Sequence, residues 1–152
     1  MVIDCETLKR EVEEMLEKNG VWVLSTSLHD EVTSRPMSIV HIGLDVYFQT
    51  NACYVKYEQM RENPNVALSC QNVSIQGVAQ AIGNWDVPEN APVMALYTAK
   101  HPGSFKAYGS LEGQLVYKVT PTRIKLWKYE DGRPFREVMH VGEGRAERLD
   151  FM

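Results

Sequence analysis

The sequence is poor in cysteine and has no long apolar run. Its three cysteines, Cys5, Cys53 and Cys70, are scattered, and no two have the C-x-x-C spacing of a zinc or dithiol redox site. Unpaired thiols of this kind are typical of a reducing cytoplasm. The N-terminal segment is acidic and amphipathic, unlike a secretion signal, and no apolar run approaches the roughly 20 residues of a membrane span. We therefore expect a cytoplasmic protein with no membrane segment.

An excess of positive charge is also absent. The formal net charge is -4 and the pI is near 5.6, so no overall basic field is available for nucleic acid or an anionic membrane surface. The four histidines show no metal-ligand spacing, and no repeat or low-complexity tract is visible. With 152 residues, of which 44% are hydrophobic, the chain fits one domain with a substantial core. Any anion must be bound locally.

Apolar periodicity predicts a mainly β chain with a few helices. Helices are expected at 4–19, 52–62 and 86–100, and about seven short strands at 21–27, 34–42, 46–50, 66–70, 73–81, 113–119 and 122–129. The first three strands are predicted to form an antiparallel meander. Pro36 cannot donate a ladder hydrogen bond, which places it at an edge, a bulge or a strand start. The pattern favours a small antiparallel barrel with helices packed outside it.

Two segments are expected to be less regular. His101-Pro102-Gly103 ends the third helix, and a looser stretch is predicted to follow it. The charged, glycine-containing residues 131–152 are predicted to form an irregular tail after a barrel domain at 1–130. This tail either lies along a partner subunit or is solvated.

Polar residues gather where the third strand leads into the second helix. Arg35 opens the second strand, and Thr50, Asn51 and Lys56 surround the start of the helix. Free backbone N–H groups and the helix dipole favour an anion there, and a guanidinium with an ammonium suits the two charges of a phosphate monoester. We interpret this stretch as a phosphate site. The alternative for Arg35 is a solvated charge at a strand end.

This order of strands and motifs resembles the pyridoxamine 5′-phosphate oxidase-like family of FMN-binding split barrels. The motifs that carry the resemblance cover roughly residues 5–130 and are Leu24-Ser25-Thr26, Arg35-Pro36, Tyr47-Phe48-Gln49-Thr50-Asn51, Lys56-Tyr57, Glu62-Asn63-Pro64 and Gln76-Gly77-Val78-Ala79. The resemblance implies an antiparallel, Greek-key-like split barrel with flanking helices. It also implies a homodimer that holds two FMN molecules in grooves between the two barrels.

The resemblance further implies a role for individual residues. Arg35 and Lys56 are implied phosphate ligands, and the strand through Pro36, Met37 and Ser38 is the implied wall along the flavin ring. The other implied cofactor contacts are Gln49, Thr50, Asn51, Asn72 from the other subunit, and Trp127 beside the flavin. Packing in a core or an interface is the alternative for Trp127. No residue is expected to act as a general acid or base, because electron transfer is the cofactor's own chemistry.

The sequence departs from the oxidase proper at two places. A lysine near the flavin and the substrate is replaced here by Val40, and the C-terminal Arg-x-His is replaced by Arg133-Pro134-Phe135 or Arg136-Glu137-Val138. We therefore expect a flavoprotein that is not a pyridoxamine phosphate oxidase and resembles the general-stress and nitroimidazole-reductase-like branch. The leading hypothesis is an FMN-dependent oxidoreductase that passes electrons to a small-molecule acceptor. The alternatives are a non-catalytic module that holds flavin or haem for storage or sensing, and deazaflavin as the native cofactor.

Overall fold

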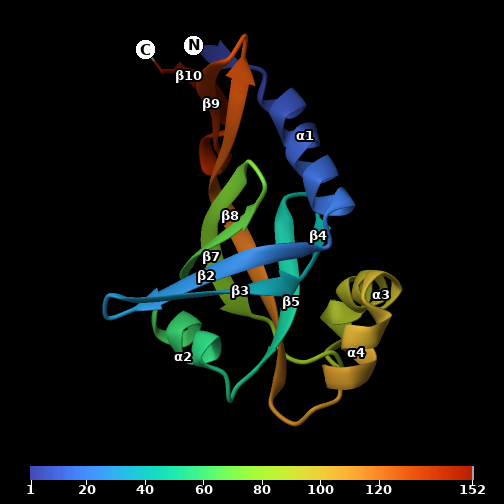
Figure 1. Cartoon of the computed structure of the whole chain (residues 1–152). Helices are drawn as coiled ribbons and strands as arrows, with labels where there is room; N and C mark the ends of the chain where they lie inside the picture. Colours follow the sequence, from blue (N-terminus) through green and yellow to red (C-terminus); the bar gives the residue numbers. More distant parts are fainter. Residues whose placement is uncertain (152) are drawn as a thin grey trace.

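The computed structural model describes residues 1–151, which form one antiparallel sheet curled into a barrel with helices outside it (Figure 1). The ten strands are β1 (Val2–Ile3), β2 (Val21–Leu28), β3 (Glu31–Ser38), β4 (Val40–Ile42), β5 (Asp45–Asn51), β6 (Asn65–Cys70), β7 (Val73–Ala81), β8 (Gln114–Glu130), β9 (Arg133–His140) and β10 (Arg145–Asp150). The α-helices are α1 (Cys5–Lys18), α2 (Val55–Glu62), α3 (Ala91–Lys100) and α4 (Pro102–Tyr108), with short 3₁₀ helices η1 (Pro88–Asn90) and η2 (Val141–Glu143).

The long strand β8 joins the lower and upper parts of the molecule. The hydrogen-bonded order is β1-β10-β9-β8-β7-β6-β2-β3, and β5 adds to β8 while pairing with β4. The N-terminal half of β8 pairs with β5, as in Val46 opposite Val119, and its C-terminal half pairs with β9, as in Arg123 opposite His140. The split-barrel fold predicted for this chain is confirmed.

A β-bulge accounts for one difference from the predicted strands. The strands expected at 113–119 and 122–129 are one continuous strand, β8. Between Gln76 and Gly77 of β7 the register shifts, so that Gln76 lies opposite Arg123 and Gly77 opposite Pro121. Thr122 is the extra residue. A side chain at Gly77 would place its Cβ 2.7 Å from the Thr120 carbonyl oxygen, so the bulge requires glycine there.

A sharp corner divides the predicted strand 34–42 into β3 and β4. The corner residue, Ile39, is fully buried, and its N–H donates to the Gly20 carbonyl at 2.9 Å. Strand β3 pairs only with β2, whereas β4 pairs with β5. Both antiparallel pairings predicted for these three strands are therefore present, but they do not form one continuous meander, because the chain changes partners at the corner. Pro36 lies in β3 at the edge of the sheet, as predicted.

The two segments expected to be irregular are regular. Residues 133–150 form β9, η2 and β10, which extend the sheet beyond β8, and β1 pairs with β10. The stretch after His101 is helix α4, which has Pro102 at its first position, where proline's missing N–H has no helical partner to lose. Both expectations of irregular structure are wrong.

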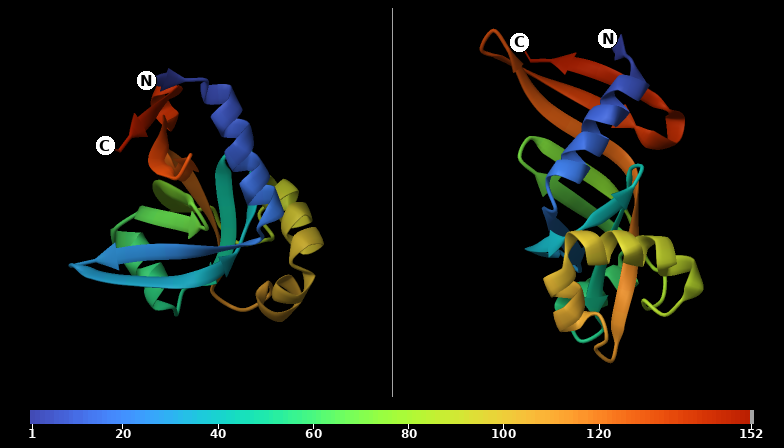
Figure 2. Two further views of the ribbon diagram at one scale, coloured as in Figure 1. Left: turned by 45° about the horizontal axis from the view of Figure 1, so that its top comes forward. Right: turned by 90° about the vertical axis from the view of Figure 1, so that its right-hand side faces the viewer.

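Two apolar clusters hold the helices on the barrel. Helix α1 presents Leu8, Val12 and Leu16, all nearly inaccessible, to the main core inside the barrel, which includes Trp22 and Phe48. Helix α3 packs through its buried side chains on a second cluster, composed of Val40, Tyr47, Trp85, Val93, Tyr97 and Val116. Figure 2 shows α3 and α4 together on one side of the barrel. None of the helices in residues 1–151 is long and apolar enough to cross a membrane.

Candidate functional site

A cavity of about 200 Å³ lies between β3, β5, the start of α2 and the α3–α4 pair. Six of the residues predicted from the sequence line it together: Pro36, Met37, Ser38, Gln49, Thr50 and Lys56. The first three are consecutive in the edge strand β3, and the next two lie at the end of β5. The strand-turn-helix order of the sequence therefore becomes one wall and one end of a single cavity.

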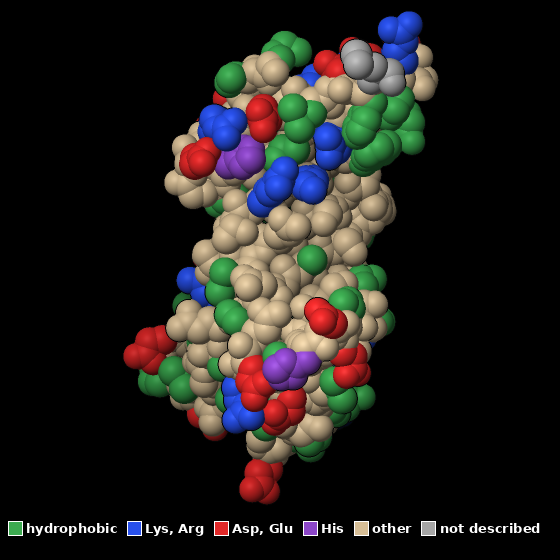
Figure 3. Space-filling model, turned by 90° about the vertical axis from the view of Figure 1, so that its left-hand side faces the viewer, with side chains coloured by type: hydrophobic (Ala, Val, Ile, Leu, Met, Phe, Trp, Pro, Cys, Tyr) green, Lys and Arg blue, Asp and Glu red, His purple; other side chains and the backbone are tan. Residues whose placement is uncertain are grey.

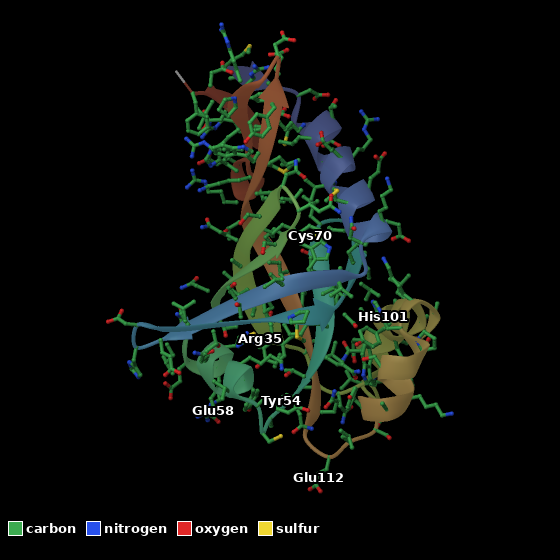
Figure 4. The ribbon with its side chains drawn as sticks, in the orientation of Figure 1. Arg35, Tyr54, Glu58, Cys70, His101 and Glu112 are labelled. Atoms are coloured by element: carbon green, nitrogen blue, oxygen red, sulfur yellow. The ribbon has the colours of Figure 1, made fainter. Side chains whose placement is uncertain are left out.

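Lys56 lines the cavity at its α2 end, and Arg35, which is not one of the lining residues, lies near it. Arg35 projects from β3 toward α2 (Figure 4). Lys56 lies in the first turn of that helix. Burial lowers the pKa of Lys56, and the nearby Arg35 guanidinium lowers it further. Burial also lowers the pKa of Arg35. Among residues 1–151 neither side chain forms a salt bridge, so both charges remain available to an anion.

Neutral oxygen atoms hold the Arg35 guanidinium. One terminal nitrogen donates to Thr26 Oγ1 at 2.9 Å and to the Leu24 carbonyl at 3.3 Å, and the other donates to Thr33 Oγ1. Neutral acceptors fix the orientation of the guanidinium without cancelling its charge. Lys56 is oriented differently, with its ammonium 4.3 Å from the centre of the Tyr54 ring, in a cation–π contact.

Thr50 contributes a hydroxyl with no partner. The residue is only 2% exposed and lines the cavity, and no hydrogen bond reaches its Oγ1 within the described chain. A buried hydroxyl without a partner costs about 1–3 kcal/mol. A polar ligand in the cavity would satisfy this atom, which makes Thr50 a specific indication of a ligand.

Two other predicted residues, Gln49 and Asn51, use their polar side-chain atoms in hydrogen bonds within the protein. The Gln49 amide donates to the Ser104 carbonyl and hydroxyl, both at 3.2 Å, and accepts from the Trp85 indole N–H at 3.0 Å. Asn51 donates to the Glu112 carbonyl at 3.0 Å and to Gln114, and accepts from the backbone N–H of Cys53. Gln49 lines the cavity wall, whereas Asn51 lies outside the lining and holds the turn that leads into α2.

The remaining two predicted residues lie away from the cavity. Asn72 donates to the Trp127 carbonyl at 3.0 Å, next to the β6–β7 turn. Trp127 is 41% exposed on the upper part of the sheet, where its ring centre is 4.9 Å from that of Phe151. A single chain does not bring Asn72 and Trp127 to the cavity.

Five lining residues were not predicted from the sequence: Tyr54, Tyr97, Ser104, Tyr108 and Gln114. Three of them come from α3 and α4, and Tyr97 donates to or accepts from Ser104 Oγ at 2.9 Å. Tyr54 directly precedes α2. Of the five, it had the clearest signal in the sequence, because a tyrosine two residues before Lys56 can contact both a ligand and the cation. The tyrosines give the cavity aromatic surface beside its charged end.

The strand order defines a split-barrel protein with a cavity between β3, β5 and α2. The sequence pattern of the pyridoxamine 5′-phosphate oxidase family matches residues 8–128. The chain belongs to this family. None of the curated proteins matches the chain closely enough to add a more specific assignment.

Solved structures with the same fold include proteins of several descriptions. General Stress Protein 26 from Bacillus anthracis has 21% identity and a TM-score of 0.61, covering 77% of this chain and 91% of that one. A NimC/NimA family protein from Clostridium acetobutylicum has 18% identity and a TM-score of 0.58, covering 94% and 93%. HutZ, the haem storage protein of Vibrio cholerae, has 13% identity and a TM-score of 0.63, covering 75% and 89%. At these identities the similarity shows a shared fold alone.

Proposed function

We propose that the chain binds FMN in the cavity and acts as an oxidoreductase that transfers electrons to a small-molecule acceptor. The observation that carries this proposal is the α2 end of the cavity. Lys56 and Thr50 line it, Arg35 lies near Lys56 just outside the lining, neither cation has an acidic partner within residues 1–151, and the Thr50 hydroxyl is buried without a partner. A phosphate monoester carries close to two negative charges and accepts several hydrogen bonds, so it matches both cations and the hydroxyl. When bound, FMN supplies the electron transfer itself.

The chain's own residues would hold and shield the cofactor. Arg35, Lys56 and Thr50 would bind the phosphate, and the β3 backbone from Pro36 to Ser38 would line one face of the ring system. The tyrosines of α3 and α4 would exclude water from the other side of the cavity. No side chain needs to act as an acid or a base.

Activity as a pyridoxamine phosphate oxidase is not part of the proposal. Val40, which occupies the place of the expected lysine, is 2% exposed and belongs to the second apolar cluster. A cation there would have to leave that cluster. The general-stress and nitroimidazole-reductase-like proteins are the better comparison for the reaction class.

A homodimer completes the proposed site. The cavity of about 200 Å³ is smaller than the roughly 300–1,000 Å³ of most small-molecule sites, so one chain would enclose only part of FMN. Figure 3 shows one face on which Lys and Arg side chains predominate in the upper part, with some acidic side chains among them. Acidic side chains predominate in the lower part, and a waist with few charges lies between the two. Two copies related by a two-fold axis through that waist would place opposite charges together. Asn72 and Trp127 are proposed to reach the cofactor through this partner.

Buried nitrogen atoms on the upper part of the sheet also support a partner. The Nε atoms of Arg123 and Arg136 are buried and have no hydrogen-bond partner within the described chain. Arg136 lies opposite Trp127 in the β8–β9 ladder, and its guanidinium is 4.7 Å from the centre of the Phe151 ring. A carboxylate or a carbonyl from a second chain would satisfy these groups only if the two side chains turn their Nε atoms toward the surface on assembly.

Haem is the second candidate cofactor, because HutZ and a haem-binding protein from Mycobacterium smegmatis share the fold. None of the four histidines lines the cavity, and two of them, His41 and His101, hydrogen-bond backbone carbonyls. FMN therefore fits the cavity better. Deazaflavin remains an alternative with a comparable phosphate, and a cytoplasmic location remains part of the proposal.

The test is the identity of the cofactor in purified protein. We expect a flavin absorbance spectrum, one FMN per chain after reconstitution, and tighter binding of FMN than of riboflavin, which lacks the phosphate. A sharp haem band in place of flavin, or failure to bind added FMN, would contradict the proposal. Competition between FMN and deazaflavin distinguishes those two cofactors. Turnover with reduced nicotinamide and a panel of nitroaromatic acceptors distinguishes an oxidoreductase from a non-catalytic module, and sedimentation velocity tests the dimer.

A further inference from the structure

Gln59 is a buried polar side chain in α2 that the sequence pattern did not single out. It is 4% exposed and lies one turn after Lys56 on the same helix. Its side chain points to the β2–β3 hairpin instead of the cavity, where it meets the two threonines that hold Arg35. Gln59 therefore contacts β3, the strand that contains Arg35, while it belongs to α2, the helix that contains Lys56.

The hydrogen bonds around Gln59 have one consistent assignment of donors. Gln59 Nε2 donates to the Glu31 carbonyl at 3.2 Å, which fixes the amide so that Oε1 faces the threonines. Thr26 Oγ1 donates to this oxygen at 2.5 Å, and Thr33 Oγ1 donates to it at 2.6 Å. Each hydroxyl has a single proton, so both protons are used in the hydrogen bonds to Gln59 Oε1.

Because both protons point to Gln59, the two hydroxyls can act only as hydrogen-bond acceptors toward Arg35. Their oxygen lone pairs remain, and these accept from the two terminal nitrogens of the guanidinium. Without the Gln59 oxygen, either hydroxyl is free to turn its proton toward the other threonine, since the two oxygens are only 3.2 Å apart. One acceptor for the guanidinium would then be lost.

The neutrality of the Gln59 side chain matters as much as its shape. A glutamate at this place would also accept from the threonines, but it would add a negative charge behind Arg35 in a partly buried site. That charge would compete with a bound phosphate for the guanidinium. A neutral amide orients the hydroxyls and leaves the full positive charge for the ligand.

We propose that Gln59 is a positioning residue for the phosphate: through the Thr26 and Thr33 hydroxyls it sets the orientation of Arg35 and links β3 to the helix that carries Lys56. The inference rests on the proposed binding of FMN. It assigns no contact between Gln59 and the cofactor. Its consequence is that changes at Gln59 should affect the phosphate part of the ligand and leave the flavin ring unaffected.

The experiment compares the affinities of FMN and riboflavin for the wild type and for Gln59→Met. Methionine is similar in size to glutamine but lacks the amide oxygen, so we expect FMN to bind about tenfold more weakly while riboflavin binding changes less than twofold. Gln59→Glu should reduce FMN affinity at least as much. Glu58→Gln is the matched control, because Glu58 points away from Arg35 on the exposed side of α2 and pairs with Arg61 (Figure 4).

Two variants of Thr33 test the hydrogen bonds that link Gln59 to Arg35, and they also show whether a loss of FMN affinity comes from a folding defect. Thr33→Val removes one of the two hydroxyls and should lower FMN affinity, Thr33→Ser should restore it, and Gln59→Met combined with Thr33→Val should lose less than the sum of the single losses. Equal loss of FMN and riboflavin, or unchanged FMN affinity in both Gln59→Met and Thr33→Val, would overturn the inference. A wild type with no preference for FMN over riboflavin would overturn the proposed function itself, and the inference with it.

Discussion

Lys56 and Lys128 are both partly buried lysines, but their surroundings differ. At Lys128, on the upper part of β8, burial alone would lower the pKa, yet Glu11 and Glu137 raise it above its ordinary value. Its ammonium is 2.7 Å from Glu11 and contacts Glu137. At Lys56, burial and Arg35 lower the pKa, and no carboxylate forms a salt bridge with it in residues 1–151.

The same contrast holds for the arginines. Arg148 in β10 pairs with Glu130 at 2.7 Å and with Asp150 at 2.8 Å, which raises its pKa, whereas Arg35 is held by hydroxyl and carbonyl oxygens. The upper part of the sheet uses carboxylates to anchor these cations to the fold. The α2 end of the cavity holds its cations with neutral groups and so keeps their charge for a ligand. This difference separates structural cations from binding cations, and four experiments test it.

The largest effect is expected from Arg35→Ala. A charge-assisted hydrogen bond contributes about 1.5–3 kcal/mol, and Arg35 is partly buried, so FMN affinity should fall by roughly 10- to 100-fold. Binding is measured by quenching of flavin fluorescence, and the fold by circular dichroism. Arg61→Ala, which removes an exposed arginine paired with Glu58, is the control and should bind FMN normally. Retention of wild-type affinity by Arg35→Ala would show that this arginine does not bind the phosphate.

Lys128→Met should give the opposite result. Breaking its partly buried pairs with Glu11 and Glu137 should lower the free energy of unfolding by about 1–2 kcal/mol, since such pairs lie between exposed and fully buried ones. FMN affinity should change less than twofold. Urea denaturation gives the first quantity and a flavin titration gives the second. A large loss of FMN binding at unchanged stability would invalidate the distinction between the two lysines.

Thr50→Val tests the buried hydroxyl. Valine has nearly the same shape and removes an unpartnered polar atom, so the protein without cofactor should become more stable by about 1 kcal/mol. FMN should nevertheless bind severalfold more weakly. Thr120→Val, at an exposed position of β8, is the control. Thermal unfolding with and without FMN measures both effects, and lower stability without cofactor would show that Thr50 has a partner in the protein.

The smallest effect concerns pH. Because the folded-state pKa of Lys56 lies below its ordinary value of 10.5, its ammonium is lost as the pH rises through that lowered pKa. FMN affinity should therefore fall about two- to fivefold over this window below pH 10.5, as expected for a partly exposed pair. A lowered lysine pKa opposes folding at neutral pH, and this penalty disappears as the pH rises toward 10.5, so cofactor-free wild type should gain stability relative to Lys56→Met.

Lys56→Arg is the control for the pH experiment, because arginine stays charged throughout this range. Any titration of the flavin itself affects both proteins equally. The ratio of their FMN affinities should change with pH. A constant ratio would mean that Lys56 does not bind the phosphate as a cation.

The sequence predicted the elements whose side chains alternate clearly between core and solvent. Strand β7 has the predicted bounds because apolar residues from Val73 to Ala81 alternate with polar ones. Helix α1 was predicted to within a residue at each end from Leu8, Val12 and Leu16. Strand β10 gave no such signal, because only Ala146 of it is buried and charged residues dominate the rest; Arg145 pairs with Glu147 along the strand and with Glu143 in η2.

The candidate site could be predicted only where it is local in sequence. Thr50 and Lys56 follow from the strand end and the helix start that short-range chemistry sets. Arg35 was predicted to open its strand, but it lies in the middle of β3, because that strand begins at Glu31. Tyr97 and Ser104 reach the cavity only through the packing of α3 and α4 on β5, which no local pattern encodes. The link from Gln59 to Arg35 depends on the register that places Thr26 opposite Thr33, and register is a property of the folded sheet.

The pairing of β5 with β8 has a consequence for how the chain folds. Asn51 lies opposite Gln114, so β5, which ends at the cavity, pairs with a strand that begins more than sixty residues further along the chain. Until that partner is made, β5 can pair only with β4 and presents an open hydrogen-bonding edge. Contacts this distant in sequence slow folding. A partly synthesised chain that ends before residue 114 therefore leaves open the edge that β8 later covers, and an open strand edge of this kind favours aggregation.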